Sequence, residues 1–244
     1  IIAMEKLIEG ARRLGISLTP AQVGRFKVYY EELIDWNRRM NLTAIVNYDE
    51  VQIKHFLDSL TVFTAFSKMP STVMDVGTGA GLPGVALKII RPDIELTLVD
   101  SVQKKAVFLE YLVDVLKLDG VQVVAGRAED LAHDAHYRKS FDAVLSRGVA
   151  RLAVLSELAL PFCRVGGVFI AMKKWDAGAE VDEADEAISV LGGRLKQTVH
   201  VEIEELSDRA LVVIDKVKST PDKYPRRAGI PQKRPLLRSA KGAS

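Results

Sequence analysis

A group of closely spaced glycines directly follows a short apolar segment in the first half of the chain. Residues 73–76 are Val-Met-Asp-Val, and an apolar run at 85–90 comes after the glycines, which are Gly77, Gly79, Gly81 and Gly84. Strand, glycine loop and helix in this order are typical of the first unit of a nucleotide-binding α/β fold. Glycine lets the backbone turn tightly and lets a ligand lie against it, because there is no Cβ. We therefore predict a nucleotide site at this loop, facing the N–H groups at the start of the helix.

Acidic residues follow the next two predicted strands. The strand at 94–100 ends in Asp100, where a carboxylate can accept hydrogen bonds from both hydroxyls of a ribose. The strand at 121–125 is followed by Ala128, Glu129 and Asp130, which puts carboxylates where an adenine amino group could be held. The alternative is that Glu129 and Asp130 only begin the next helix, where acidic side chains are favoured.

The nature of the nucleotide depends on the residues around the glycines. Gly79, Gly81 and Gly84 fit G-x-G-x-x-G, so a nicotinamide cofactor has to be considered. Asp75 favours S-adenosylmethionine instead, since a carboxylate facing the loop suits an ammonium and a sulfonium but repels a pyrophosphate. Pro83 removes one N–H that could bind a phosphate. We expect S-adenosylmethionine, with Asp75, Gly77, Gly79, Gly81 and Asp100 in the site.

The remaining pattern predicts the elements that position these residues. Strands are expected at 141–146 and 168–172, helices at 103–117, 152–162 and 180–191, and a closing hairpin at 199–203 and 210–216. Alternating strands and helices imply an α/β fold: a mostly parallel sheet with a C-terminal antiparallel hairpin and helices on both faces. Ligands then bind at the carboxyl ends of the strands, where Gly77, Asp100, Glu129, Arg147 and Lys173 fall.

Residues 1–70 are predicted to form an N-terminal helical cap ahead of a cofactor-binding domain at 71–218. Thr19-Pro20 has the pattern of a helix start, and Phe26, Tyr30 and Leu33 recur on one helical face. A later helix carries His55, for which a structural role and a substrate role are both open.

Residues 219–244 form a basic, proline-rich tail. This tail holds seven Lys or Arg and one Asp, a charge of +6, so the overall net charge of +2 leaves −4 for the rest of the 244 residues. Basic tails commonly bind nucleic acid, and we expect RNA contacts from Arg226, Arg227, Lys233 and Arg234. The tail is predicted to be extended and partly mobile without RNA. The alternative is that Tyr224, Ile230 and Leu236 dock it on the fold.

Several functional classes are not indicated by the sequence. No apolar run approaches the length of a membrane span, and no signal peptide is visible. Cys163 is the only cysteine, which fits a reducing compartment and reads as a small buried apolar residue. No Cys/His cluster has metal-ligand spacing. We expect a cytoplasmic, metal-free protein that is a monomer.

The ordered motifs resemble one family. The central motifs are the loop at 75–84, Arg127-Ala128-Glu129 and Ser146-Arg147. Further motifs lie upstream, at Asn41-Leu42-Thr43 and the His55–Ser59 run, and downstream, at Leu191-Gly192-Gly193 and residues 224–231. Together these motifs resemble the RsmG (GidB) family over nearly the whole chain. The resemblance implies a class I, Rossmann-like methyltransferase acting on guanine N7 of 16S ribosomal RNA or the small ribosomal subunit. It also implies cofactor contacts at Gly77, Leu82, Ala128, Glu129 and Arg147. Lys173-Lys174 departs from the Lys-Gly common in that family.

Guanine N7 chemistry needs few catalytic groups. N7 has a free lone pair, so no general base is required, and we see no catalytic dyad. The task is to align the reacting atoms. Arg147, Lys173 and His55 are the candidate positioning residues, with surface charges as the alternative for the first two. Two other functions stay open: an NAD-linked dehydrogenase, and a non-catalytic RNA-binding assembly factor.

Overall fold

The computed structural model describes residues 4–176 and 178–237 and shows one mixed sheet. Its seven strands lie in the order β3-β2-β1-β4-β5-β7-β6. Strands β1 to β5 are parallel, and β7 is inserted antiparallel between β5 and β6. The strands are β1 (Thr72–Val76), β2 (Glu95–Asp100), β3 (Val121–Ala125), β4 (Phe141–Arg147), β5 (Cys163–Lys174), β6 (Gly193–His200) and β7 (Arg209–Lys216). The predicted mostly parallel sheet with a C-terminal antiparallel hairpin is confirmed.

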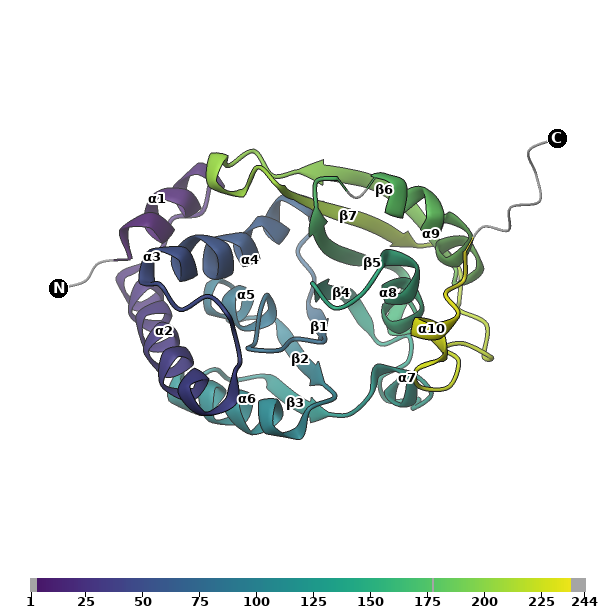
Figure 1. Ribbon diagram of the computed structural model, residues 1–244, viewed down its shortest axis with the longest axis horizontal. Coiled ribbons are helices and arrows are strands. Elements are labelled where there is room, and N and C mark those ends of the chain that lie inside the picture. The colour runs from purple at the N-terminus through teal and green to yellow at the C-terminus, as the bar shows by residue number, and fades with distance from the viewer. Residues whose placement is uncertain (1–3, 177, 238–244) are drawn as a thin grey trace.

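Helices cover both faces of this sheet. Figure 1 shows α5, α6 and the N-terminal helices on one side, and α8, α9 and α10 on the other. The helices are α1 (Glu5–Arg13), α2 (Pro20–Met40), α3 (Tyr48–Val51), α4 (Asp58–Leu60), α5 (Gly84–Ile90), α6 (Gln103–Val115), α7 (Ala128–Leu131), α8 (Leu152–Ala159), α9 (Gly178–Val190) and α10 (Ile230–Lys233). A π-helical turn η1 (Gln52–Leu57) and the 3₁₀ turns η2 (Thr61–Ala65) and η3 (Glu204–Leu206) complete the set. Each face therefore has its own apolar core.

The first strand of the hairpin is the largest difference from the predicted elements. β6 begins at Gly193 and ends at His200, so the predicted strand at 199–203 overlaps it by only two residues. Most of its side chains are exposed, including Arg194, Lys196 and Gln197. An edge strand with one neighbour buries few residues, so it lacks the apolar alternation that identifies an inner strand.

Helix α2 begins as predicted and packs on the sheet domain through one face. The Thr19 side chain accepts from the Gln22 N–H while the Gln22 side chain accepts from the Thr19 N–H, a complete capping box. Its fully buried residues are Phe26, Tyr29 and Leu33. Tyr29 rather than Tyr30 is thus on the buried face, which turns its hydroxyl toward the sheet domain.

The tail is docked on the fold over its described residues. Tyr224 is buried and Leu236 packs against the same core, while Ile230 begins the short helix α10. The Arg226 guanidinium donates three hydrogen bonds to Glu157, a residue of α8 with no exposed surface, at 2.6, 2.9 and 3.2 Å. The docking alternative therefore holds for Tyr224 and Leu236, and the expectation of an extended tail is wrong for residues 219–237, whereas its mobility without RNA stays a prediction. Arg238 and Lys241 lie outside the described residues.

Candidate active site at the carboxyl edge of the sheet

The glycine loop between β1 and α5 has the backbone conformation that its composition predicts. Gly77, Gly79 and Gly81 have φ angles of 71, 61 and 94°, in the left-handed region that side chains other than glycine rarely adopt. A Cβ on Gly84 would lie 2.9 Å from the carboxylate of Asp75. The loop therefore wraps closely around the end of β1.

Asp75 is the residue around which the loop is wrapped. Its Oδ2 accepts from the Thr78 hydroxyl at 2.7 Å and from the Gly84 N–H at 2.8 Å. Its Oδ1 is buried and has no hydrogen-bond partner among the described residues. Complete burial raises the Asp75 pKa to about 6, and the two hydrogen bonds only partly offset this effect. One oxygen thus orders the loop, and the other is buried without a hydrogen-bond partner.

Asp100, at the end of β2, meets the loop from the neighbouring strand. Its Oδ2 accepts from the Gly79 N–H at 3.0 Å, and its Oδ1 accepts from the Val102 N–H at 2.9 Å. Lys105 lies 3.5 Å from the same carboxylate. The structure therefore brings Asp75, Gly79 and Asp100 together, although they come from different strand ends.

The cap contacts the glycine loop directly, which the sequence did not predict. The Tyr29 hydroxyl of α2 donates to the Ala80 carbonyl at 2.7 Å. Burial raises the pKa of this phenol well above its usual value, so it remains a proton donor. Because Tyr29 is fully buried, the cap supports the loop from beneath.

Ala128 and Glu129 are the first two residues of α7, which follows the end of β3. The predicted alternative, that acidic residues merely begin a helix here, is correct for the backbone. The Glu129 side chain has a more specific partner, because its Oε1 accepts from the Gly229 N–H of the tail at 3.0 Å. The tail therefore lies beside this end of the loop region.

A second polar cluster surrounds Asp58, a buried residue of the cap. Arg147, at the end of β4, donates to Asp58 Oδ2 at 3.1 Å and to the Lys54 carbonyl at 3.3 Å. Arg209, the first residue of β7, lies 3.9 Å from Asp58 Oδ1. Burial raises the Asp58 pKa, and the two arginines oppose this without cancelling it. Asp58 therefore faces two cations from the sheet, of which Arg209 also lies 3.7 Å from Asp208.

These residues line a pocket of about 420 Å³ between the cap and the ends of β4 and β5. Its walls also include His55, Lys173 and Lys174. The His55 Nε2 lies 2.7 Å from the Thr43 hydroxyl, and burial together with Arg147 lowers the His55 pKa to about 4. Lys173 bonds Glu180 at 2.6 Å and the Ala150 carbonyl at 2.8 Å. All three predicted positioning candidates, Arg147, Lys173 and His55, therefore lie in one pocket.

The comparisons with known proteins agree on one family. A family model described as "rRNA small subunit methyltransferase G" (GidB) matches residues 22–212. A protein of Dehalococcoides mccartyi named ribosomal RNA small subunit methyltransferase G is 49% identical over 96% of this chain and all of its own length. A protein of the same name from Pelotomaculum thermopropionicum is 48% identical over 96% of this chain and 99% of its own.

The chain belongs to the rRNA small subunit methyltransferase G family.

Solved structures support the fold of the family. An O-methyltransferase from Bacillus cereus in complex with SAH has a TM-score of 0.57 at 17% identity, covering 78% of this chain and 91% of that one. A SAM-dependent methyltransferase from Aquifex aeolicus has a TM-score of 0.52 at 19% identity, covering 69% and 94%. The family member described here is thus an S-adenosylmethionine-dependent methyltransferase with a class I fold. The family assignment does not support the dehydrogenase or the non-catalytic assembly factor.

The residues present fit S-adenosylmethionine. Gly79 leaves the loop backbone open, since a Cβ there would meet only the Gly77 carbonyl oxygen at 4.0 Å, and the unpartnered Asp75 Oδ1 suits a cationic group. Within residues 4–176 and 178–237, no three His, Cys, Asp or Glu side chains are placed to hold a metal ion. In the same residues no helix is long and apolar enough to cross a membrane.

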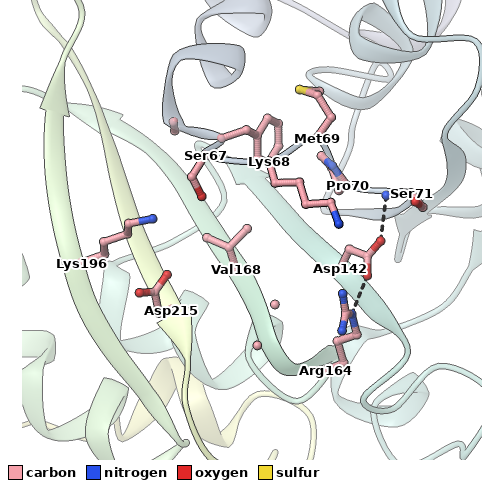
Figure 2. Close-up of a pocket in the computed structure, with 14 residues that line it drawn as sticks. Ser67, Lys68, Met69, Pro70, Ser71, Asp142, Arg164, Val168, Lys196 and Asp215 are labelled. Carbon is pink, nitrogen blue, oxygen red and sulfur yellow. Dashed lines mark hydrogen bonds and ion pairs between the residues drawn. The ribbon is translucent and has the colours of Figure 1, made fainter.

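A second pocket, of about 200 Å³, lies at the amino ends of the parallel strands (Figure 2). Asp142 lines this pocket, where it accepts from the Ser71 N–H at 2.7 Å and pairs with Arg164 at 2.5 Å. Figure 2 also shows Lys68 directed into this pocket, with Lys196 and Asp215 on the neighbouring strands. None of the residues predicted for the site lines this pocket.

Three site residues were missed by sequence reasoning. Asp58 had a signal, since a charged residue in the run His55-Phe-Leu-Asp-Ser-Leu60 requires a buried partner. Tyr29 and Arg209 had none, because their contacts join segments far apart in the sequence.

Proposed function

We propose that this chain transfers a methyl group from S-adenosylmethionine to N7 of a guanine in 16S (small-subunit) ribosomal RNA. The observation that carries the proposal concerns two features at the carboxyl edge of the sheet. The glycine loop, which is bound by Asp75 and Asp100, and the Arg147 pocket, which the cap helps to line, both lie there. Membership of the rRNA small subunit methyltransferase G family supports RNA as the substrate.

The cofactor is assigned to residues at three strand ends. The loop backbone at Gly77, Gly79, Gly81 and Leu82 forms the cradle, and Asp75 Oδ1 holds the ammonium group. Asp100 accepts from the ribose, while Ala128 and Glu129 border the adenine. When bound, S-adenosylmethionine supplies an electrophilic methyl group.

The acceptor atom decides what the protein has to do. Guanine N7 carries a lone pair and no proton, so a base is unnecessary and the residues need only align N7 with the methyl carbon, about 3 Å away. His55 fits this requirement. Its pKa of about 4 keeps it uncharged at neutral pH, so it forms a neutral wall of the pocket.

Arg147 is proposed to position the substrate without opposing the reaction. N7 becomes positively charged as the methyl group arrives, so a free cation beside it would raise the barrier. Asp58 and the Lys54 carbonyl hold the Arg147 guanidinium and offset its charge. An arginine held in this way can still contact guanine O6 or a phosphate. Lys173, paired with Glu180, is assigned the same kind of role.

The tail is proposed to supply phosphate contacts through its exposed cations. Arg227, Lys233 and Arg234 are exposed, whereas the Arg226 guanidinium is bound to Glu157. Arg226 was expected to contact RNA, and its position indicates instead that it anchors the other three. We propose this division of labour for the cap at 1–70, the methyltransferase domain at 71–218 and the tail at 219–244. The enzyme acts as a monomer in the cytoplasm, where the small subunit is assembled.

The test is methyl transfer to a defined base. Purified chain is incubated with labelled S-adenosylmethionine and small-subunit RNA or particles that lack the modification, and the labelled nucleotide is then mapped. We expect one labelled guanine carrying the methyl group on N7. Label on an exocyclic amine, on a ribose or only on protein would overturn the proposal.

A further inference from the structure

Trp175 is an exposed aromatic residue beside the Arg147 pocket. Half of its surface, 50%, is open to solvent, although aromatic side chains are usually buried. It lies in the loop that joins β5 to α9, and its two neighbours, Lys174 and Asp176, both line the pocket. Trp175 therefore lies in the chain between two residues that line the pocket proposed for the target guanine.

The indole is held in place, although it is exposed. The backbone N–H of Trp175 donates to the Asp208 carbonyl at 2.7 Å, and this hydrogen bond holds the loop against the start of β7. Its ring packs on His200 of β6, with the ring centroids 4.2 Å apart and the planes inclined by 48°. His200 is in turn fixed by its Nε2, which lies 2.8 Å from the Ser207 carbonyl. A supported aromatic ring loses little freedom when a ligand stacks on it.

The charges around Trp175 select the class of ligand. Lys174 is exposed and makes no ion pair with any described residue. Arg147 and Arg209 lie in the same pocket and both pair with Asp58, and Arg209 also lies 3.7 Å from Asp208. An open aromatic ring next to an unpaired cation, here Lys174, is the combination that binds single-stranded nucleic acid, in which a base stacks on the ring and a phosphate meets the cation.

We propose that Trp175 is a stacking platform for the unpaired base next to the target guanine, with Lys174 on the intervening phosphate. This inference rests on the proposed function, because it takes RNA as the substrate. It adds a recognition subsite outside the cofactor loop, on the β5–α9 loop, and explains why a large aromatic side chain is left half exposed there.

Fluorescence gives a direct test, because the chain has only two tryptophans, Trp36 and Trp175. Trp36 packs on Phe108 and Tyr111, so Trp36→Phe is a mild change that leaves Trp175 as the sole indole. We expect the emission of this variant to be quenched, with saturation, as unmodified small-subunit RNA is added. Unchanged emission at RNA concentrations that saturate filter binding would overturn the proposal.

Substitutions provide the second measurement. Trp175→Ala should weaken RNA binding by roughly 5- to 150-fold, the range of one lost base–aromatic stack, while Trp175→Phe retains most of the affinity. Tyr111→Ala removes another exposed aromatic ring, on α6, and should leave RNA affinity unchanged. Cofactor affinity and melting temperature should not move in either Trp175 variant.

The outcomes separate the two proposals. Wild-type RNA affinity and methylation in Trp175→Ala would overturn the stacking role and leave the proposed function intact. Failure of the wild-type chain to methylate small-subunit RNA would overturn the proposed function, and this inference with it.

Discussion

The two edges of the sheet each contain an arginine–aspartate pair at a pocket, yet the pairs differ in their surroundings. At the carboxyl edge, Asp58 is 5% exposed and shares its charge between Arg147 and Arg209. At the amino edge, Asp142 is 20% exposed and pairs with Arg164, which is 55% exposed (Figure 2). The same two residue types thus form a buried cluster at one edge and a surface clamp at the other.

The pKa values of the two carboxyls move in opposite directions. Burial raises the pKa of Asp58, and its arginines do not cancel the effect. Burial also opposes ionisation of Asp142, but hydrogen bonds from Ser71, Thr72 and Arg164 outweigh it and lower the pKa. Asp142 is therefore satisfied by the fold itself. Asp58 is held in a less favourable state, which is common where a site is prepared for a ligand.

Replacing the arginine of each pair in turn tests this contrast most strongly. Arg147→Gln should reduce single-turnover methyl transfer by about 100-fold, because misplacement of a substrate by about 1 Å has effects of that size. Arg164→Gln should change transfer by less than about twofold, since exposed pairs contribute at most about 1 kcal/mol of stability. Rapid-quench assays of both variants, with melting curves as the control, provide the measurement. Equal activities would remove the distinction between the edges.

The aspartates that bind backbone N–H groups offer a second contrast. Asp75→Asn keeps an oxygen acceptor for Thr78 and Gly84 but removes the charge. We expect cofactor affinity to fall at least about tenfold, since a bond to a charged group contributes roughly 1.5–3 kcal/mol. Stability should be unchanged or higher, because a buried charge is lost. Asp142→Asn should do the reverse, lowering the melting temperature without affecting cofactor affinity. Calorimetric titration and thermal melts of both variants decide this.

The parallel strands were predicted well from the sequence, whereas contacts between segments far apart in the chain were predicted poorly. The strand ends at Asp75, Asp100 and Arg147 follow from apolar runs that stop at polar residues, so the carboxyl edge could be assembled in advance. β6 was misplaced because an exposed edge strand has no apolar alternation. Asp58 and Arg209 meet only through tertiary packing, and no local pattern indicates that contact.

The docking of the tail is indicated by a residue of the helix that it contacts, and not by the sequence of the tail itself. Proline and basic residues suggested an extended chain. Glu157, the single acid in the apolar helix α8, in fact required a cation, and Arg226 supplies it. A buried acid in an apolar helix therefore indicates that one cation of a basic segment elsewhere in the chain binds it and does not contact RNA.

Acid should weaken cofactor binding through Asp75. Its pKa of about 6 implies that about nine tenths of the carboxyl is ionised at pH 7 and about one tenth at pH 5, so the dissociation constant should rise about tenfold over that interval. His55, with a pKa of about 4, stays largely neutral there and does not interfere. Titrations at pH 5, 6 and 7 should show this slope in the wild type and lose it in Asp75→Asn. A slope retained in the variant would assign the effect to another group.

The same pKa values set opposite effects on stability. The folded pKa of Asp75 lies above its ordinary value of 3.8, so the folded chain binds more protons between pH 3.8 and 6, and this contribution to stability falls as pH rises through that range. The lowered pKa of Asp142 gives a contribution that is present above pH 3.8 and is lost as pH falls further. Melts of the wild type and the two Asn variants between pH 3.5 and about 7 separate the two contributions.

The smallest expected effect compares one lysine from each edge. Lys174 and Lys68 are both exposed, and each lines its own pocket. If RNA enters only the carboxyl-edge pocket, Lys174→Gln removes one phosphate contact and lowers the log–log salt slope of RNA affinity by about 0.7, whereas Lys68→Gln leaves the slope as it was. Between 50 and 200 mM salt that difference amounts to about 2.6-fold in affinity, which filter binding over a full salt series can measure. Equal losses of slope in both variants would mean that RNA spans both edges, and the contrast between a substrate edge and a structural edge would then apply to the chemistry but not to binding.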